Sequence, residues 1–200
     1  MANDGFRLRA LLKCTRGATM VETTLTLVLM LGLTFGIIEF ANALWQWNSA
    51  EKATKVGARL AATADPVAQG LKTFDCATAT ILLGTSCKDP SAATFGTIVC
   101  SGSTSSCSGG YTYSSAAMAV IVTGMQAIFP RIQTANVIVE YRDVRLGFAG
   151  RGRAVPAITV RLTGMTYTFT AIDNLYGLGP ITMPDFRATL TGEDLSDDGA

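Results

Sequence analysis

Residues 17–64 read GATMVETTLTLVLMLGLTFGIIEFANALWQWNSAEKATKVGARLAATA. Within this stretch, residues 23–47 carry a single charge, on Glu39, and residues 25–38 carry none. A helix over residues 23–47 would be about 37 Å long, which is enough to cross a bilayer core of roughly 30 Å. The stretch therefore predicts one membrane-spanning helix near the start of the chain.

The residues that flank this apolar run predict its orientation. Trp45 and Trp47 follow the run, where indole rings are expected at the level of the lipid headgroups. A basic excess before the run favours a cytoplasmic N-terminus, although basic residues beyond its other end weaken the asymmetry. The flanking charges are Asp4, Arg7, Arg9, Lys13 and Arg16 before the run and Lys52, Lys55 and Arg59 after it.

The composition of the whole chain excludes several classes of function. Its 200 residues allow one core of ordinary size. A net charge of +1 offers no general basic excess for nucleic-acid binding. The absence of histidine removes Ser-His and Cys-His pairs and imidazole metal ligands. We therefore expect no enzyme, with no catalytic residues, cofactor, metal or small-molecule substrate.

Two kinds of processing are compatible with this N-terminus. The triplet Ala41-Asn42-Ala43 could end a secretory signal, in which case the mature chain would begin at Leu44. The two carboxylates in or beside the apolar run argue against a signal peptide. Alternatively, cleavage after Gly17 would remove a short basic leader, residues 1–17.

Cleavage after Gly17 would make Ala18 the first residue and Glu22 the fifth. The simplest interpretation of Glu22 is that it marks the membrane interface. A carboxylate that lies deeper in a membrane is functional by default, because its burial is unfavourable. The new α-amino group of a neighbouring copy could pair with Glu22 through charge-assisted hydrogen bonds and set an assembly register.

Residues 16–64 resemble the N-terminal segment of type IV pilin-like proteins, most closely the TadE-like pseudopilins, or minor pilins, of the tight-adherence (Tad/Flp) pilus. The matching features are Arg16-Gly17, Glu22, the Gly-Ile-Ile-Glu-Phe sequence at 36–40 and the Ala-rich continuation to Ala64. Residues 135–191 resemble the strands of that family more loosely. Thr23 stands where members usually carry Phe or Tyr, and Ala18 stands where other type IV pilins often carry Phe.

The resemblance implies a protein that is cleaved after Gly17 by a prepilin peptidase and assembles through its apolar helix. Glu22 would pair with the amine of an adjacent subunit. The implied partners are other pilins and pseudopilins, the inner-membrane assembly platform and membrane lipid. The implied role is initiation or the tip of a pilus used for adhesion. The alternative is a single-pass, membrane-anchored periplasmic binding or scaffold protein that is not polymerised.

The sequence also predicts the part outside the membrane, residues 65–200. The helix should continue from residue 18 to 64 with an apolar stripe, because Asp65-Pro66 disfavours further helix. A second amphipathic helix is expected over 114–129, closed by Pro130. Three or four antiparallel strands are expected, with an edge strand or bulge at Pro184. These segments are 137–141, 156–162, 165–170 and 181–190. The fold class is α+β and pilin-like, a long helix packed on a small sheet.

Residues 67–113 hold four of the five cysteines, and residues 101–110 are typical of a flexible loop. The fifth cysteine, Cys14, would leave with the leader. Four cysteines outside the cytoplasm indicate two disulfides, with three possible connectivities. We favour Cys76–Cys87 and Cys100–Cys107 because their loops are short. An all-cysteine zinc site is the rival interpretation, although no C-x-x-C spacing is present.

One basic cluster surrounds several glycines between residues 142 and 161. It could contact DNA, an acidic surface or the acidic tail of another subunit. A solvated hairpin loop is the simpler interpretation. The cluster comprises Arg142, Arg145, Arg151, Arg153 and Arg161, and the tail carries Glu193, Asp194, Asp197 and Asp198.

Overall fold

The computed structural model describes residues 15–151, 155–177 and 179–192. Most of the expected leader with Cys14, the basic residue Arg153 and the acidic tail lie outside the described residues. The chain divides into two compact units. The first unit holds the described residues up to Leu44 together with the segment Thr168–Pro180, and the second holds Trp45–Tyr167 and the chain from Ile181 onward.

Helix α2, Thr15–Thr63, contributes to both units. Its end agrees with the expectation from Asp65-Pro66, and Ala64 N donates a final hydrogen bond of 2.8 Å to Leu60 O. In the first unit, threonine hydroxyls donate to backbone carbonyls of the preceding turn, as from Thr23 to Thr19 O at 2.7 Å. These bonds leave few unsatisfied polar groups on the helix, as a lipid environment requires.

The first unit exposes the apolar side chains of α2. Between Met20 and Leu44 the large side chains are mostly exposed, and the most apolar window of the helix is 0% buried. By length and composition, α2 is able to cross a membrane. A second, shorter element of this unit is helix α4, Ala171–Tyr176. The sequence predicted no helix here; of the strand expected over 165–170, the structure has only Thr166–Tyr167, which belongs to a separate two-stranded sheet.

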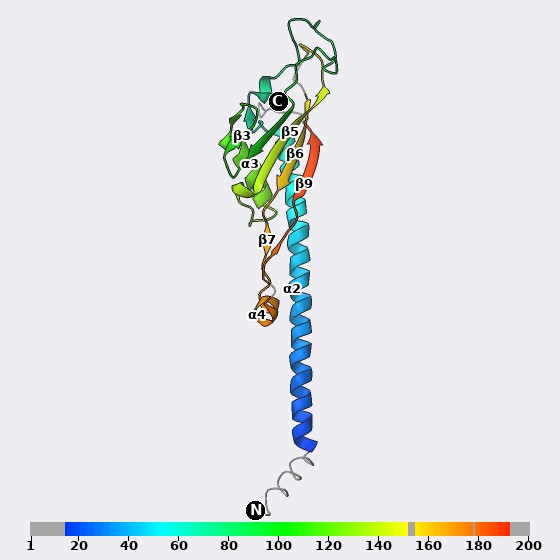
Figure 1. Ribbon diagram of the computed structural model, residues 1–200, viewed down its shortest axis with the longest axis vertical. Helices are drawn as coiled ribbons and strands as arrows, with labels where there is room; N and C mark the ends of the chain where they lie inside the picture. The colour runs from blue at the N-terminus through cyan, green and yellow to red at the C-terminus, as the bar shows by residue number, and fades with distance from the viewer. Residues whose placement is uncertain (1–14, 152–154, 178, 193–200) are drawn as a thin grey trace, which may run out of the picture. The chain divides into compact units, whose positions relative to one another are not determined.

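The second unit is built on an antiparallel sheet, with strand order β3-β2-β5-β6-β9 among the described residues (Figure 1). The sequence predicted three or four strands, whereas the described sheet has five. β2 and β3 lie in a region for which the sequence predicted no strand. The strands are β2 Thr97–Ser101, β3 Ser106–Cys107, β5 Val137–Leu146, β6 Val155–Leu162 and β9 Phe186–Thr191.

Alternation along the strands gives the sheet one buried face. Tyr141 of β5 pairs with Ile98 of β2 and Ile158 of β6, and all three are completely buried. The intervening residues, such as Thr159 and Thr189, lie on the opposite, more exposed face, where their hydroxyls are 2.8 Å apart. A one-residue slip would exchange the two faces, so the buried set determines the register.

The buried face is covered by helices. Helix α3, Ser115–Gln126, begins at Ser114, whose side chain accepts a hydrogen bond from Ala117 N. It ends before the expected position near Phe129, although its buried stripe includes the predicted Met118 and Met125. The second half of α2 also lies here. A Cβ at Gly57 would lie 2.6 Å from Met125 Sδ and 3.4 Å from Val160 Cγ1, so this glycine packs against both α3 and β6.

Small side chains make this close packing possible. They occupy buried positions in adjacent pairs about four residues apart along α2, which matches one face of a helix. The buried positions are Ser49, Ala50, Ala53, Thr54, Gly57, Ala58, Ala61 and Ala62. The structure thus confirms the α+β, pilin-like expectation of a long helix packed on a sheet with a second short helix.

The expected strand over 181–190 is divided in two. β8, Ile181–Thr182, pairs with β7, Thr166–Tyr167, whereas β9 pairs with β6. Pro184 lies in the break, where no ladder hydrogen bond needs its missing N–H. β9 is at an edge of the described sheet, in agreement with the expectation of an edge strand.

Residues 67–113 are more ordered than expected. Short strands β1, Ala68–Gln69, and β4, Thr112–Tyr113, pair with each other. The stretch 101–110 was expected to be a flexible loop, and this expectation is wrong, because β3 within it forms a hairpin with β2. Cross-strand pairing between Ser101 and Ser106 leaves only a tight turn between them.

Two disulfides join the four cysteines of this region. Cys76 is bonded to Cys87 with a Cα–Cα distance of 5.6 Å, and Cys100 is bonded to Cys107 with a distance of 4.0 Å. These are the pairs that short loops favour. Cys100 and Cys107 are also directly opposed in the β2–β3 register, so strand pairing and the disulfide support each other.

Candidate functional site

The predicted processing site lies at the start of α2. Gly17 is exposed, and no atom would lie within 4 Å of a Cβ placed on it. Ala18 is exposed as well. In the described part of the chain, therefore, nothing packs over the Gly17–Ala18 bond. A helix must be locally unwound before a protease can cut it, and the first turn of a helix is where this requires the least energy.

Glu22 lies about one turn further along the same helix. Its side chain is exposed among apolar neighbours, including Met20 and Val21. No hydrogen bond or ion pair joins its carboxylate to any of the residues that the structure describes; only its backbone carbonyl accepts a bond, from Thr26 Oγ1. Glu22 is thus an acid in an apolar surface whose charge can be met by a group from another molecule.

Glu39 is the second acid of the apolar stretch, and its surroundings differ completely. Its Oε1 accepts hydrogen bonds from the backbone N–H groups of Thr170 at 2.6 Å and Ala171 at 2.5 Å. Its Oε2 accepts from Ile172 N at 2.9 Å. The first N–H groups of a helix have no partner within that helix, and Glu39 supplies one for the start of α4.

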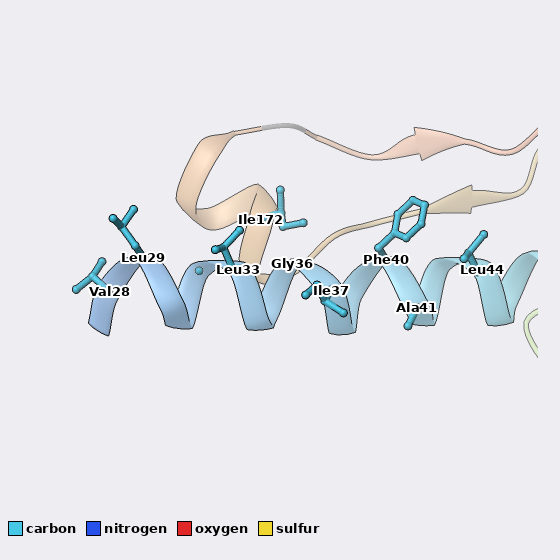
Figure 2. Close-up of a pocket in the computed structure, with 10 residues that line it drawn as sticks. Val28, Leu29, Leu33, Gly36, Ile37, Phe40, Ala41, Leu44 and Ile172 are labelled. Carbon is cyan, nitrogen blue, oxygen red and sulfur yellow. The ribbon is translucent and has the colours of Figure 1, made fainter. Parts of the chain in front are cut away.

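The segment 168–180, here called the clasp, also packs on α2 through an apolar contact. Ile172 lies over Gly36, where a Cβ would come within 3.9 Å of Ile172 Cδ1. Figure 2 shows this side chain above α2 between Leu33 and Phe40, next to an apolar groove. Gly36 leaves room for the clasp, and Glu39, one turn later, bonds its backbone.

Sequence reasoning did not identify the clasp. Glu39 was noticed as the only charge in the run 23–47, and this was the signal available, because a buried or lipid-facing acid needs a partner. The partner is backbone from residues more than 130 positions away. Backbone N–H groups leave no mark in the sequence, so the pairing could not be read from residue types.

The remaining candidates from the sequence are dispersed or already bonded. The zinc alternative is wrong for this structure, because its four cysteines are consumed by the two disulfides. Within residues 15–151, 155–177 and 179–192, no cluster of three His, Cys, Asp or Glu side chains could hold a metal.

The basic residues do not form one cluster in the described structure. Arg142 is opposite Ala157 in the β5–β6 register, whereas Arg161 is four residues further along β6. Four residues of strand separate them by about 13 Å. Arg161 is instead paired with Asp185, with Nη2 and Oδ2 2.9 Å apart. Arg145 lies within β5, where the pairing with β6 is irregular between Asp143 and Leu146, and Arg151 belongs to the segment that joins the two strands.

Comparison with known protein families finds a match for most of α2. Residues 17–59 match the family described as TadE-like protein, so this part of the chain is a TadE-like domain. The match includes Gly17, Glu22 and Glu39 and ends within the second unit. No curated protein matches the chain, and no solved structure matches it either.

Proposed function

We propose that this chain is a pseudopilin, or minor pilin, of a Tad/Flp-type pilus. Its TadE-like segment at residues 17–59 coincides with a helix whose apolar surface is exposed and whose Glu22 carboxylate is bonded to none of the described residues. This coincidence is the observation that carries the proposal. An exposed apolar helix needs either lipid or other helices around it, and a pilin uses both in turn.

The proposed first step is cleavage by a prepilin peptidase between Gly17 and Ala18. Hydrolysis of this peptide bond adds water, releases residues 1–17 with a new carboxylate, and leaves an α-amino group on Ala18. Before cleavage, the basic leader is in the cytoplasm, α2 crosses the bacterial inner membrane over about residues 23–47, and residues 65–200 are periplasmic. After assembly, the chain resides in the extracellular pilus.

The proposed second step is assembly through α2. The Ala18 amine of one subunit pairs with the Glu22 carboxylate of its neighbour, because opposite charges on an apolar surface strongly favour contact over separation. This pair fixes the register between helices. The inner-membrane platform and the other pilins of the system are the partners in this step, and initiation or the tip of an adhesive pilus is the role.

N-terminal sequencing of the protein from cells with and without the peptidase tests the first step. We expect Ala18 as the first residue in cells that have the enzyme, and an unprocessed start in cells that lack it. A Met1 start in both would exclude processing. A Leu44 start would identify a secretory signal and remove the anchor altogether.

A pair of substitutions tests the second step. Glu22→Ala should leave cleavage intact and strongly reduce the number of pili. Glu39→Ala is the matched control, because it removes an acid from the same helix whose carboxylate is already bonded within the chain. We expect it to reduce piliation far less. Normal piliation in the Glu22→Ala strain would favour the membrane-anchored binding or scaffold protein that is not polymerised.

A further inference from the structure

We propose that the clasp, residues 168–180, is a lipid-facing element that inserts into the bilayer beside α2. The chain would then contact the membrane at two places far apart in the sequence. The inference rests on α2 being a membrane helix. It requires neither the peptidase nor assembly into a pilus.

The position of Glu39 along α2 favours insertion of the clasp into the membrane. Glu39 precedes Trp45 by six residues, which corresponds to about 9 Å along a helix axis. If indole rings mark the headgroup level, Glu39 and the backbone bonded to it lie on the hydrocarbon side of that level. The clasp belongs to the same compact unit as this part of α2.

Several polar groups of the clasp are bonded within the first unit, as a segment in lipid requires. Asn174 Nδ2 donates to Thr170 O at 2.6 Å. Asp173 Oδ1 accepts from Gly179 N at 2.8 Å, and its backbone carbonyl accepts from Gly177 N at 2.7 Å. The first N–H groups of α4 are bonded to Glu39. These bonds reduce the number of polar groups of the clasp that would need water as a partner.

The composition of the clasp also suits a membrane. Residues 168–180 read TFTAIDNLYGLGP, in which Asp173 is the only charged residue. The segment contains a tyrosine, a residue type that is enriched at membrane interfaces. Glu39 therefore has a structural role that differs from that of Glu22. Its carboxylate retains the clasp against α2, and the three N–H groups offset the unfavourable transfer of that charge out of water.

A fluorophore attached to the clasp in the full-length protein tests this inference. The variant Cys14→Ser, Thr170→Cys is labelled with NBD without reductant, so that the two disulfides persist, and reconstituted into phosphatidylcholine liposomes. Thr170 is exposed and bonds Glu39 and Asn174 only through its backbone, so a label can replace its side chain. The reference site is Thr123→Cys on α3, which is exposed in the second unit. Iodide serves as the aqueous quencher and a doxyl-labelled phospholipid as the lipid quencher.

We expect the Thr170 label to be quenched by the doxyl lipid and to be several-fold less sensitive to iodide than the Thr123 label. Equal iodide quenching at both sites would overturn the proposal. Protection from both quenchers that disappears when the protein is diluted in lipid would also overturn it, because the clasp would then be covered by a second copy of the chain.

The role of Glu39 is tested in the same assay. Glu39→Ala should make the Thr170 label less sensitive to the doxyl lipid and more sensitive to iodide, whereas Glu22→Ala should leave its quenching unchanged. The Thr123 label in the Glu39→Ala background reports whether the second unit has remained folded. A Thr170 label that is still quenched by the doxyl lipid without Glu39 would contradict the assigned role of this carboxylate. Failure of pilus assembly in Glu22→Ala strains does not bear on these results.

Discussion

The two halves of α2 belong to one uninterrupted helix, yet their side chains differ in size and in what they contact. Up to Leu44 the helix presents large apolar side chains that are exposed. From Ser49 onward its buried positions are Ala, Gly, Ser or Thr. Large side chains suit a surface that is met by lipid or by other helices, whereas small ones let a sheet and α3 approach the backbone closely. Hydrophobicity alone therefore does not determine burial; side-chain size and the available partner do.

The largest expected effect is a difference in stability between two methionine substitutions. Met125 of α3 packs on the second half of α2 and is 0% exposed, whereas Met30, in the first half of α2, is 65% exposed. Met125→Ala should lower the free energy of unfolding by about 2–5 kcal/mol, because it leaves a cavity. Met30→Ala should change it by less than about 0.5 kcal/mol. Urea titration in detergent, followed by near-UV circular dichroism, measures both, and equal losses would contradict the comparison.

Two glycines sharpen the same contrast with a smaller effect. Gly57→Ala would place a methyl group 2.6 Å from Met125 Sδ, whereas nothing lies within 4 Å of a Cβ at Gly32. Both substitutions gain about 1 kcal/mol in helix propensity. The gain is common to both, so we expect the Gly57 variant to be less stable than the Gly32 variant by about 1–3 kcal/mol, from overpacking alone. Thermal unfolding of the two proteins in the same detergent gives this difference.

Tyr141 links the segment that follows α2 to the sheet and introduces a pH dependence. Its hydroxyl accepts a hydrogen bond of 2.9 Å from Val67 N, and burial raises the pKa of this tyrosine. Below a pH of about 10, the Tyr141 hydroxyl keeps its proton in both the folded and the unfolded state. In that range it adds no pH dependence to the free energy of unfolding. Above this pH, the unfolded state loses its proton first, so stability falls as pH rises.

Tyr141→Phe should therefore destabilise the protein by about 1–2 kcal/mol at neutral pH, because Val67 N loses its partner. It should also flatten the alkaline loss of stability. Burial raises the pKa values of Tyr111 and Tyr113 as well, so the difference between the wild type and Tyr141→Phe is the quantity to measure. A parallel decline of both proteins above pH 10 would show that Tyr141 is not responsible.

The smallest effect concerns the solvent face of the second half of α2. Lys55 Nζ lies 2.7 Å from Glu51 Oε1, one turn away, and both side chains are largely exposed. Lys55→Ala should lower the free energy of unfolding by about 0.3–0.5 kcal/mol in dilute buffer. The difference should vanish in concentrated salt, because exposed charges are screened. A loss that persists at high salt would point to packing of the lysine stem instead.

Much of the fold could be predicted because it depends on local patterns. The apolar run and Asp65-Pro66 predicted the extent of α2, and Ser114 with the Met118–Met125 spacing predicted α3. Alternation in β5 and β6 predicted the centre of the sheet. β2 and β3 were missed because a five-residue and a two-residue strand in a Ser- and Gly-rich region have too little alternation to be recognised. The break at Pro184 was anticipated only as an irregularity.

The candidate site likewise contains residues that could be predicted from the sequence and contacts that could not. Gly17 and Glu22 could be recognised because their significance lies in sequence order at the start of an apolar helix. The bonds of Glu39 could not be predicted, because their donors are backbone groups of residues 170–172. The sequence suggested that the arginines between residues 142 and 161 form one basic cluster. Arg142 and Arg161 are instead separated along the β5–β6 hairpin, and Arg161 is bonded to Asp185.

The sequence by itself determined that a long apolar helix precedes a disulfide-bonded α+β region, because helix length, strand alternation and cysteine spacing are properties of neighbouring residues. Only the tertiary structure decided which elements cover the second half of the helix and which of the two acids in its first half is bonded. Those outcomes depend on which distant segments come within reach of a given helix turn. The clasp reaches Glu39, and no described residue bonds the Glu22 carboxylate. This difference in spatial contact gives two chemically identical side chains different roles.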